Sequence, residues 1–338
     1  MYKIILLLTN LLLANSFLIP NFQTRYNNKL YEKMNPQNDY FDKENTNIWD
    51  QVSQNLKLKA RKWFISRAEK KGIKWYDFLE KYKDMETVKT LVSNKMLIEN
   101  KDIIYPDYFL KPFHGYDTGN MNWFAAMEGE GSTESVSVNY WKDVNPKDSQ
   151  NWFRYNFTQS VDKYIDGNPN IILDIGSSFG LGTRFLKKTF PSSYITCIDL
   201  SPYFLATAKY LDTLDYHDFD FIHANAENIP FQNNSVDLIT AQFLFHEVPT
   251  EPSLNILNEA YRVLKPGGSL AIIDLDPNRL LEGLNNNFFR KWAFEVTEPH
   301  ISEYYHTDMI ENMKTAEFQN IEKIINDPIN TVWLGKKI

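Results

Sequence analysis

A glycine-rich turn lies in the middle of the chain, where residues 171–182 read IILDIGSSFGLG. The apolar run ends in Asp174, and Gly176 and Gly180 follow in a segment that leads into a helical pattern. Glycines at such a position allow a tight turn and let the backbone approach a bound ligand closely. The segment therefore predicts a ligand-binding turn between a strand and a helix.

The spacing of the glycines narrows the choice of nucleotide. The dinucleotide fingerprint G-x-G-x-x-G fails from Gly176, because Ser178 and Leu181 stand in its later glycine positions. It also fails from Gly180, because Phe185 stands in its last glycine position. No Gly-Lys-Ser/Thr follows, so a Walker-type phosphate loop is excluded and a nicotinamide cofactor is disfavoured.

Polar residues also close the next two apolar runs. Asp199 lies at the end of the second run, where an acid can accept hydrogen bonds from both ribose hydroxyls of an adenosine. Asn225 and Ala226 follow the third run. Each residue alone could be a helix-cap or turn residue. Together, at successive strand ends where open α/β sheets bind ligands, they favour an adenosine site.

Strand-like and helix-like segments alternate from residue 170 onward, which predicts a parallel sheet with right-handed crossovers. The chain closes with AEFQNIEKIIND and TVWLGKKI, two β-rich segments separated by a short turn. Such a short connection predicts an antiparallel pair, because a parallel return needs a longer crossover. We therefore expect an α/β fold with a Rossmann-like, seven-stranded, mostly parallel sheet whose last strand is reversed.

Five ordered motifs give the chain a family resemblance. LDIGSSFGLGT, CIDLSP, ANAENIPF, SVDLITAQFLFHEV and RVLKPGGSLAIIDLDP resemble the successive motifs of class I S-adenosylmethionine-dependent methyltransferases. They are most similar to the ubiquinone/menaquinone branch of that family, and the resemblance covers residues 170–275. It implies S-adenosyl-L-methionine as the cofactor. The cofactor-binding residues that it implies are Asp174, Gly176, Ser178, Gly180, Asp199, Leu200, Asn225, Ala226 and Gln242.

Two positions depart from the family pattern. Ser178 replaces the usual middle glycine, and a small side chain that can donate a hydrogen bond still fits there. Asn225 stands where an aspartate usually meets the adenine amino group, and its amide oxygen can still accept that hydrogen bond. These departures predict a modified cofactor site, not a broken one.

The segment before the sheet predicts a helical, substrate-covering cap over residues 48–165, followed by the methyltransferase domain over residues 166–338. KPFHGYDTGNMNW in the cap and EPHISEYY after the fifth strand resemble a subgroup of plastid and cyanobacterial methyltransferase-like proteins. Aromatic side chains in such segments can enclose a flat acceptor, although they can also serve only as core. The candidate acceptor-binding residues are His114, Tyr116, Trp123, His300, Tyr304 and Tyr305.

His246, in the segment FLFHEVP after the fourth strand, is the candidate catalytic base. Methyl transfer to oxygen or carbon can require removal of a proton, and histidine is suited to that task. The alternative is that His246 packs beneath the following loop. The sequence predicts no metal site.

The first residues predict intracellular targeting. Residues 1–16 combine a lysine, a short apolar stretch and small residues near the end, which is typical of a signal peptide. Residues 17–47 lack apolar periodicity and are expected to be a disordered, transit-like segment. Because ANS-FLIP resembles the cleavage site of two-part plastid presequences, we expect delivery to a plastid. A buried N-terminal helix and an endomembrane lumen are the alternatives.

Composition bounds the remaining choices. The net charge of −7 argues against nucleic acid, and the single cysteine excludes an intramolecular disulfide. We expect no transmembrane helix in the mature chain. The sequence thus predicts a methyltransferase (EC 2.1.1.-) that acts at carbon or oxygen of a small hydrophobic or aromatic acceptor. An inactive binding or assembly protein and a protein methyltransferase are the alternatives.

Overall fold

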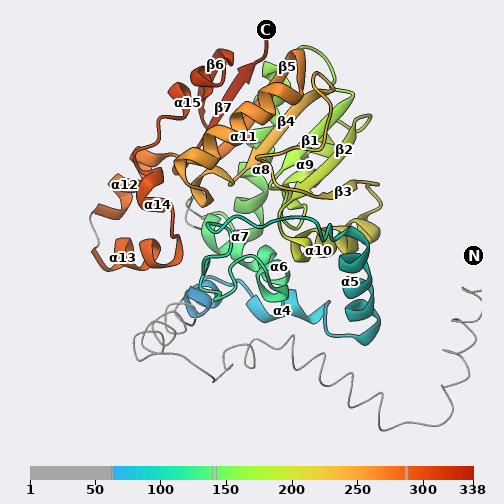
Figure 1. Ribbon diagram of the computed structural model, residues 1–338. Helices are drawn as coiled ribbons and strands as arrows, with labels where there is room; N and C mark the ends of the chain where they lie inside the picture. The colour runs from blue at the N-terminus through green and yellow to red at the C-terminus, as the bar shows by residue number, and fades with distance from the viewer. Residues whose placement is uncertain (1–61, 63, 139, 142, 286–287) are drawn as a thin grey trace, which may run out of the picture.

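The structure is a computed structural model that describes residues 62, 64–138, 140–141, 143–285 and 288–338 (Figure 1). The predicted signal peptide and transit-like segment, residues 1–16 and 17–47, lie outside the described residues. Among the helices within the described ranges, none is both long and apolar enough to cross a bilayer.

The described part of the chain is built around a seven-stranded sheet with the order β3-β2-β1-β4-β5-β7-β6. β7 runs antiparallel to both of its neighbours, β5 and β6, and the other neighbouring pairs are parallel. This arrangement confirms the predicted Rossmann-like sheet with its reversed last strand. The strands are β1 (Ile171–Ile175), β2 (Tyr194–Asp199), β3 (Asp220–His223), β4 (Val236–Gln242), β5 (Leu264–Leu275), β6 (Gln319–Ile325) and β7 (Asn330–Lys336).

The central strands are apolar on both sides because helices cover both faces of the sheet. In β1, Leu173 packs in one hydrophobic cluster and Ile172 in the other, as the alternation of side chains along a strand requires. Cys197 of β2 is fully buried and lies 3.7 Å from the hydroxyl oxygen of Thr183. Burial raises the pKa of the Cys197 thiol.

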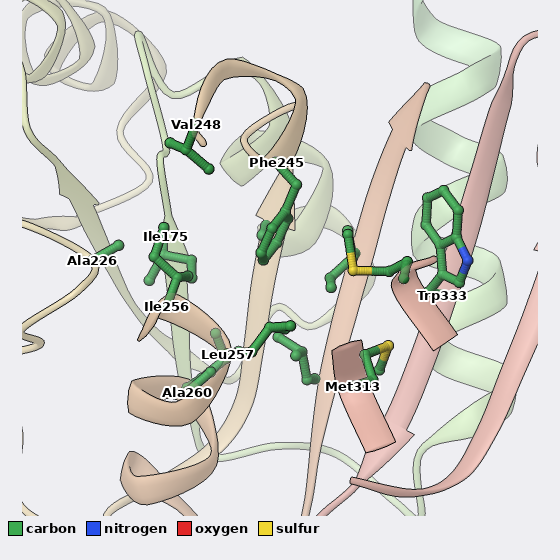
Figure 2. Packing of buried hydrophobic residues seen from close by; sticks show 14 of the residues in the cluster. Ile175, Ala226, Phe245, Val248, Ile256, Leu257, Ala260, Met313 and Trp333 are labelled. Carbon is green, nitrogen blue, oxygen red and sulfur yellow. The ribbon is translucent and has the colours of Figure 1, made fainter. Parts of the chain in front are cut away.

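One face of the sheet is covered by α11 (Thr250–Val263) and α15 (Met309–Thr315). Figure 2 shows Ile256, Leu257 and Ala260 of α11 turned toward the sheet, with Met313 of α15 between α11 and Trp333. The other face is covered by α8 (Pro146–Tyr164), α9 (Leu181–Thr189) and α10 (Pro202–Asp215). α8 falls within the predicted cap, yet its apolar side chains pack directly on the sheet.

The remaining helices lie beside this three-layered unit. The cap contributes α4 (Trp75–Glu80), α5 (Met85–Ile98), α6 (Trp123–Met127) and α7 (Gly129–Ser137). Figure 1 shows these four helices gathered below the sheet, with α5 beside α10. Between β4 and β6, the chain adds the 3-10 turn η1 (Phe245–Glu247), α12 (Pro277–Asn285), α13 (Phe288–Thr297) and α14 (Ile301–Tyr304). The cap and the η1 and α13–α14 segments approach the sheet near the predicted site.

Candidate active site

The glycine loop between β1 and α9 contains three residues with left-handed backbone. Gly176, Ser178 and Gly180 have φ angles of +64°, +53° and +79°. Such φ values are readily accessible only to glycine, so the structure explains why a glycine usually stands at position 178. Serine nevertheless adopts this conformation here. The Ser178 backbone N–H donates a hydrogen bond of 2.8 Å to Asp199, which ties the loop to the end of β2.

Asp174 braces the glycine loop from below. Its two carboxylate oxygens accept hydrogen bonds of 2.6 Å from the hydroxyls of Thr183 in α9 and Thr240 in β4. The side chain is almost fully buried, and burial raises its pKa although these hydrogen bonds oppose the shift. Asp174 therefore connects β1, α9 and β4. This arrangement suits a residue that holds the shape of the cofactor-binding loop.

Gln242, at the end of β4, lies against the first turn of α9. A Cβ atom at Gly182 would be only 2.3 Å from the Gln242 amide nitrogen, so any larger residue here would displace the Gln242 side chain. From the sequence, Gly182 is expected only to ease the turn into the helix, and the structure shows that its absent side chain also makes room for Gln242.

Asp199 connects the glycine loop to the end of β2. One carboxylate oxygen accepts the hydrogen bond from Ser178, and the other accepts a 2.7 Å hydrogen bond from the Ser201 backbone N–H. Burial raises the pKa of Asp199 to about 6, despite these two hydrogen bonds. A carboxylate fixed in this way, at the end of the strand beside β1, is positioned to accept hydrogen bonds from a ribose.

The predicted adenine-binding residues form a turn that the cap covers. The Asn225 side-chain oxygen accepts a 2.9 Å hydrogen bond from the Glu227 backbone N–H. Glu227 in turn accepts a 2.7 Å hydrogen bond from the Tyr108 hydroxyl of the cap. Ala226 is buried in the same turn. The cap segment that begins at Tyr105 thus lies over the turn that the sequence assigned to adenine.

A second cap contact holds the end of β2 and the end of β3 together. The ring nitrogen Nε2 of His223 lies 3.0 Å from the carbonyl oxygen of Leu200 and 3.2 Å from the Tyr105 hydroxyl. The other ring nitrogen accepts a 2.9 Å hydrogen bond from the Asn100 backbone N–H. Sequence analysis identified Leu200 but missed His223 and the tyrosines, because their proximity depends on how the cap folds over the sheet.

Arg154 is a buried cation that the sequence analysis also missed. It lies in α8, with only 6% of its surface exposed, and donates hydrogen bonds to Gln150 and to Thr133 of α7. Burial lowers its pKa to about 9, while the negative charge of Asp174 acts in the opposite direction. Among the described residues, Arg154 forms no salt bridge and its Nε atom has no hydrogen-bond partner.

The candidate base His246 is buried in η1 and paired with Asp274 of β5. Its Nδ1 atom lies 2.7 Å from a carboxylate oxygen of Asp274. Burial alone would lower the pKa of His246, but the charge and hydrogen bond of Asp274 outweigh burial and raise the pKa to about 9. The Asp274 carboxylate thus favours the protonated form of His246. The buried Tyr304 packs against its ring and donates a 2.7 Å hydrogen bond to the Leu275 carbonyl.

The other candidate acceptor residues fall into different surroundings. The Tyr116 hydroxyl donates to Glu128 within the cap, and Trp123 packs edge-on against Tyr203 of α10. His300 packs edge-on against Tyr108. Tyr305 is buried, like its neighbour Tyr304.

Among these candidates, His114 lies in a cluster of carboxyl groups. Its Nε2 atom is 3.3 Å from Glu298 and 4.0 Å from Glu247, which directly follows His246. Over the described ranges, no group of three or more potential ligands is arranged to hold a metal ion.

The central segment is similar to known methyltransferase sequences. A family profile described as a methyltransferase domain matches residues 173–272. Demethylmenaquinone methyltransferase from Listeria monocytogenes serotype 4a is 41% identical over 85 residues, which are 25% of this chain and 35% of that protein. Ubiquinone/menaquinone biosynthesis C-methyltransferase from Rickettsia prowazekii is 33% identical over 145 residues, 40% of this chain and 56% of that protein. The chain thus matches about a third of the length of the first relative and a little over half of the length of the second.

Two solved methyltransferase structures resemble part of the chain. An S-adenosylmethionine-dependent methyltransferase from Aquifex aeolicus is 22% identical, with a TM-score of 0.43 over 55% of this chain and 93% of that chain. Human N-acetylserotonin methyltransferase, solved with S-adenosylmethionine, is 16% identical, with a TM-score of 0.47 over 78% of this chain and 71% of that chain.

Proposed function

We propose that this protein is an S-adenosylmethionine-dependent methyltransferase that methylates a small hydrophobic or aromatic acceptor at carbon or oxygen. The match of residues 173–272 to a methyltransferase domain supports the proposal. The observation that carries the proposal is the link from Ser178 to Asp199. It joins the turn after β1 to the acid at the end of β2, the two features that an adenosine with an amino-acid tail requires side by side.

The described side chains fit the cofactor in their chemistry. Asp199 offers a carboxylate to the ribose hydroxyls, Asn225 offers an amide to adenine, and Arg154 offers a buried positive charge for the methionine carboxylate. When bound, the cofactor supplies an electrophilic methyl group on a sulfonium. The protein's own residues then have to orient the acceptor, exclude water and remove a proton where the acceptor carries one.

The cap supports a small acceptor over a protein substrate. Its segment 105–130 is fixed across the strand ends by contacts of Tyr105 with His223, of Tyr108 with Glu227, and of Asn120 with the residues after β2 and β4. A flexible peptide would need an open groove where this segment lies. Both relatives named above are quinone methyltransferases by name, which is consistent with an aromatic acceptor.

The first test is calorimetric titration of the full-length protein with S-adenosylmethionine and with S-adenosylhomocysteine. We expect micromolar binding of both, and at least about tenfold weaker binding by Asp199→Asn, because a charged acceptor of ribose hydrogen bonds is lost. The matched control is Asp220→Asn, at the exposed start of β3. Absence of binding by the wild-type protein would contradict the methyltransferase proposal and favour an inactive relative of the fold.

We also propose that residues 1–47 direct the protein to a plastid. The proposal rests on the signal-like stretch and the ANS-FLIP junction of the sequence. Fusion of this segment to a fluorescent protein in an alga with a secondary plastid tests it. Fluorescence in the plastid is expected, whereas retention in the endomembrane lumen would support the alternative.

A further inference from the structure

Three segments far apart in the sequence bring a polar cluster together beside the glycine loop. Glu247 lies at the end of η1, His114 lies in the cap, and Glu298 directly follows α13. His114 is the central member, because its Nε2 atom is 4.0 Å from Glu247 and 3.3 Å from Glu298. The cap is anchored here by a 3.0 Å hydrogen bond from the His114 backbone N–H to the Thr297 carbonyl.

The cluster adjoins the predicted cofactor site through Asn120. The Asn120 side-chain amide donates a 3.2 Å hydrogen bond to Glu247, and the Asn120 backbone carbonyl accepts a 2.6 Å hydrogen bond from the Ser201 hydroxyl. Ser201 also contacts Asp199. On the opposite side, Leu244 before η1 lies so close to Gly176 that a Cβ atom there would be 3.0 Å from it. Glu247 thus contacts Asn120, which is hydrogen-bonded to the residue that follows β2, and the 3-10 turn that carries Glu247 begins beside the glycine loop.

The two carboxyl groups of the cluster differ in access. The Glu298 side chain is 7% exposed, and its Oε2 atom is buried without a hydrogen-bond partner in the described part of the chain. The Glu247 side chain keeps 24% of its surface exposed. Within the same part of the chain, neither forms a salt bridge with lysine or arginine. Glu247 is thus the member that a bound molecule can reach, and Glu298 lies behind it.

Burial changes the proton affinity of both carboxyl groups. It raises the pKa of Glu247 to about 7, and the pKa of Glu298 lies well above its ordinary value. A carboxyl group that ionises near neutral pH is suited to act as a general base there. The titratable or charged groups that face Glu247 are His114, His246, Glu298, Asp199 and Asp274.

From this geometry we infer that Glu247 is the general base of the reaction and removes a proton from a hydroxyl group of the acceptor. In this step the acceptor O–H bond breaks, the proton passes to a Glu247 carboxylate oxygen, and the electron pair stays on the acceptor oxygen. The deprotonated acceptor is then a better nucleophile at that oxygen or at a conjugated ring carbon. His114 and Glu298 position Glu247, and the buried His246 and Asp274 hold the turn that carries it.

The inference rests on the proposed function but can be tested apart from it. The probe is para-nitrophenol, a phenol that ionises near neutral pH, and its non-ionising methyl ether para-nitroanisole is the reference ligand. Each is titrated into the full-length protein between about pH 5.5 and about pH 9, with and without S-adenosylhomocysteine. The variants are Glu247→Gln, which keeps the shape of the side chain, and the exposed control Glu251→Gln in the first turn of α11.

We expect wild-type affinity for para-nitrophenol to be highest near neutral pH, where one proton is shared between phenol and carboxyl group. At lower pH both partners are neutral, and at higher pH two anions repel each other. Glu247→Gln should lose this maximum and bind about tenfold more weakly at neutral pH. Glu251→Gln should behave as wild type, and para-nitroanisole should bind both variants equally.

Coinciding pH profiles for wild type and Glu247→Gln would overturn the inference, and so would failure of para-nitrophenol to bind at all. Failure of S-adenosylhomocysteine to bind would instead count against the proposed function, since the phenol titration is also made without it. Carboxyl NMR of protein labelled at glutamate, assigned with Glu247→Gln, gives a second measure. An ordinary pKa for Glu247 in that spectrum would also overturn the inference.

Discussion

The carboxylate of Asp274 holds both the ring of His246 and the backbone of the turn that carries it. One oxygen lies 2.7 Å from Nδ1 of His246, and the other accepts backbone hydrogen bonds from Phe245 and His246 at 2.8 and 3.2 Å. The Asp274 carboxylate raises the pKa of His246 and thereby favours its protonated form, which is not the form that acts as a base. The pairing therefore favours a structural part for His246, and its predicted part as the catalytic base remains a prediction.

The His246–Asp274 pair predicts a specific pH dependence of stability. Because the pKa of His246 is raised from 6.5 to about 9, its stabilisation is complete below about pH 6.5 and is lost as the pH rises through 9. The difference in unfolding free energy between wild type and His246→Gln should therefore shrink by about 3 kcal/mol between about pH 6 and about pH 10. Urea denaturation at both pH values measures it. In an Asp274→Asn background the difference should no longer shrink as the pH rises, because burial alone lowers the pKa of His246. A persistent decrease would contradict the pairing.

Ser178 predicts a stabilising substitution. Its φ of +53° is strained for any residue with a side chain, and the native contact with Asp199 comes from its backbone N–H. Ser178→Gly should therefore raise the free energy of unfolding by up to about 1 kcal/mol and preserve cofactor binding. Ser178→Ala, which keeps the strain, should give no such gain. A loss of stability in the glycine variant would show that the serine hydroxyl contributes more than the backbone strain costs.

Gly129 predicts that the cap and the glycine loop are coupled. A Cβ atom at Gly129 in α7 would lie 2.3 Å from the ring of Phe179, a buried residue of the glycine loop. Gly129→Ala should destabilise the protein by about 1–3 kcal/mol and weaken binding of S-adenosylhomocysteine, because the ring and its loop must shift. Gly283→Ala in α12 is the matched control, since nothing lies within 4 Å of its added atom. Equal effects of the two substitutions on ligand binding would argue against the coupling.

Arg154 predicts a change in ligand preference. If its buried charge meets the methionine carboxylate, Arg154→Met should weaken S-adenosylhomocysteine binding at least about tenfold, as expected for loss of a charge-assisted hydrogen bond. Methylthioadenosine lacks that carboxylate, so its affinity should hardly change. Arg154→Lys, which keeps the charge, should retain part of the binding. Calorimetry with both ligands measures the effect, and equal losses for the two would assign Arg154 to folding of α8.

The sequence predicted those parts of the site that depend on neighbouring residues. The glycine loop and the acid at the end of β2 follow from local patterns, because strand ends and left-handed turns favour particular residue types at a few consecutive positions. The alternation of strand-like and helix-like segments likewise predicted the sheet, and the short connection before the last strand predicted the reversal of β7; the structure confirms both.

The rest of the site depends on contacts across the chain. Glu247, His114 and Glu298 meet only because the cap and the segment after α13 fold against η1, and no periodic pattern connects them. Arg154 resembles any charged residue of an amphipathic helix until α7 and the sheet enclose it. The closeness of Gly182 to Gln242 is likewise a matter of how α9 packs on β4.

The reactivity of the buried Cys197 thiol reports how often the structure around it opens. The chain has a single cysteine, and it is fully enclosed between β2 and α9, with a thiol whose pKa burial raises. A thiol reagent can therefore reach it only when β2 and α9 separate, so the labelling rate counts those openings. A ligand that binds only the closed form shifts the equilibrium between the closed and open forms toward the closed one. The labelling rate falls by the same factor. Labelling kinetics thus rank ligands of the adjoining glycine loop before any acceptor has been identified.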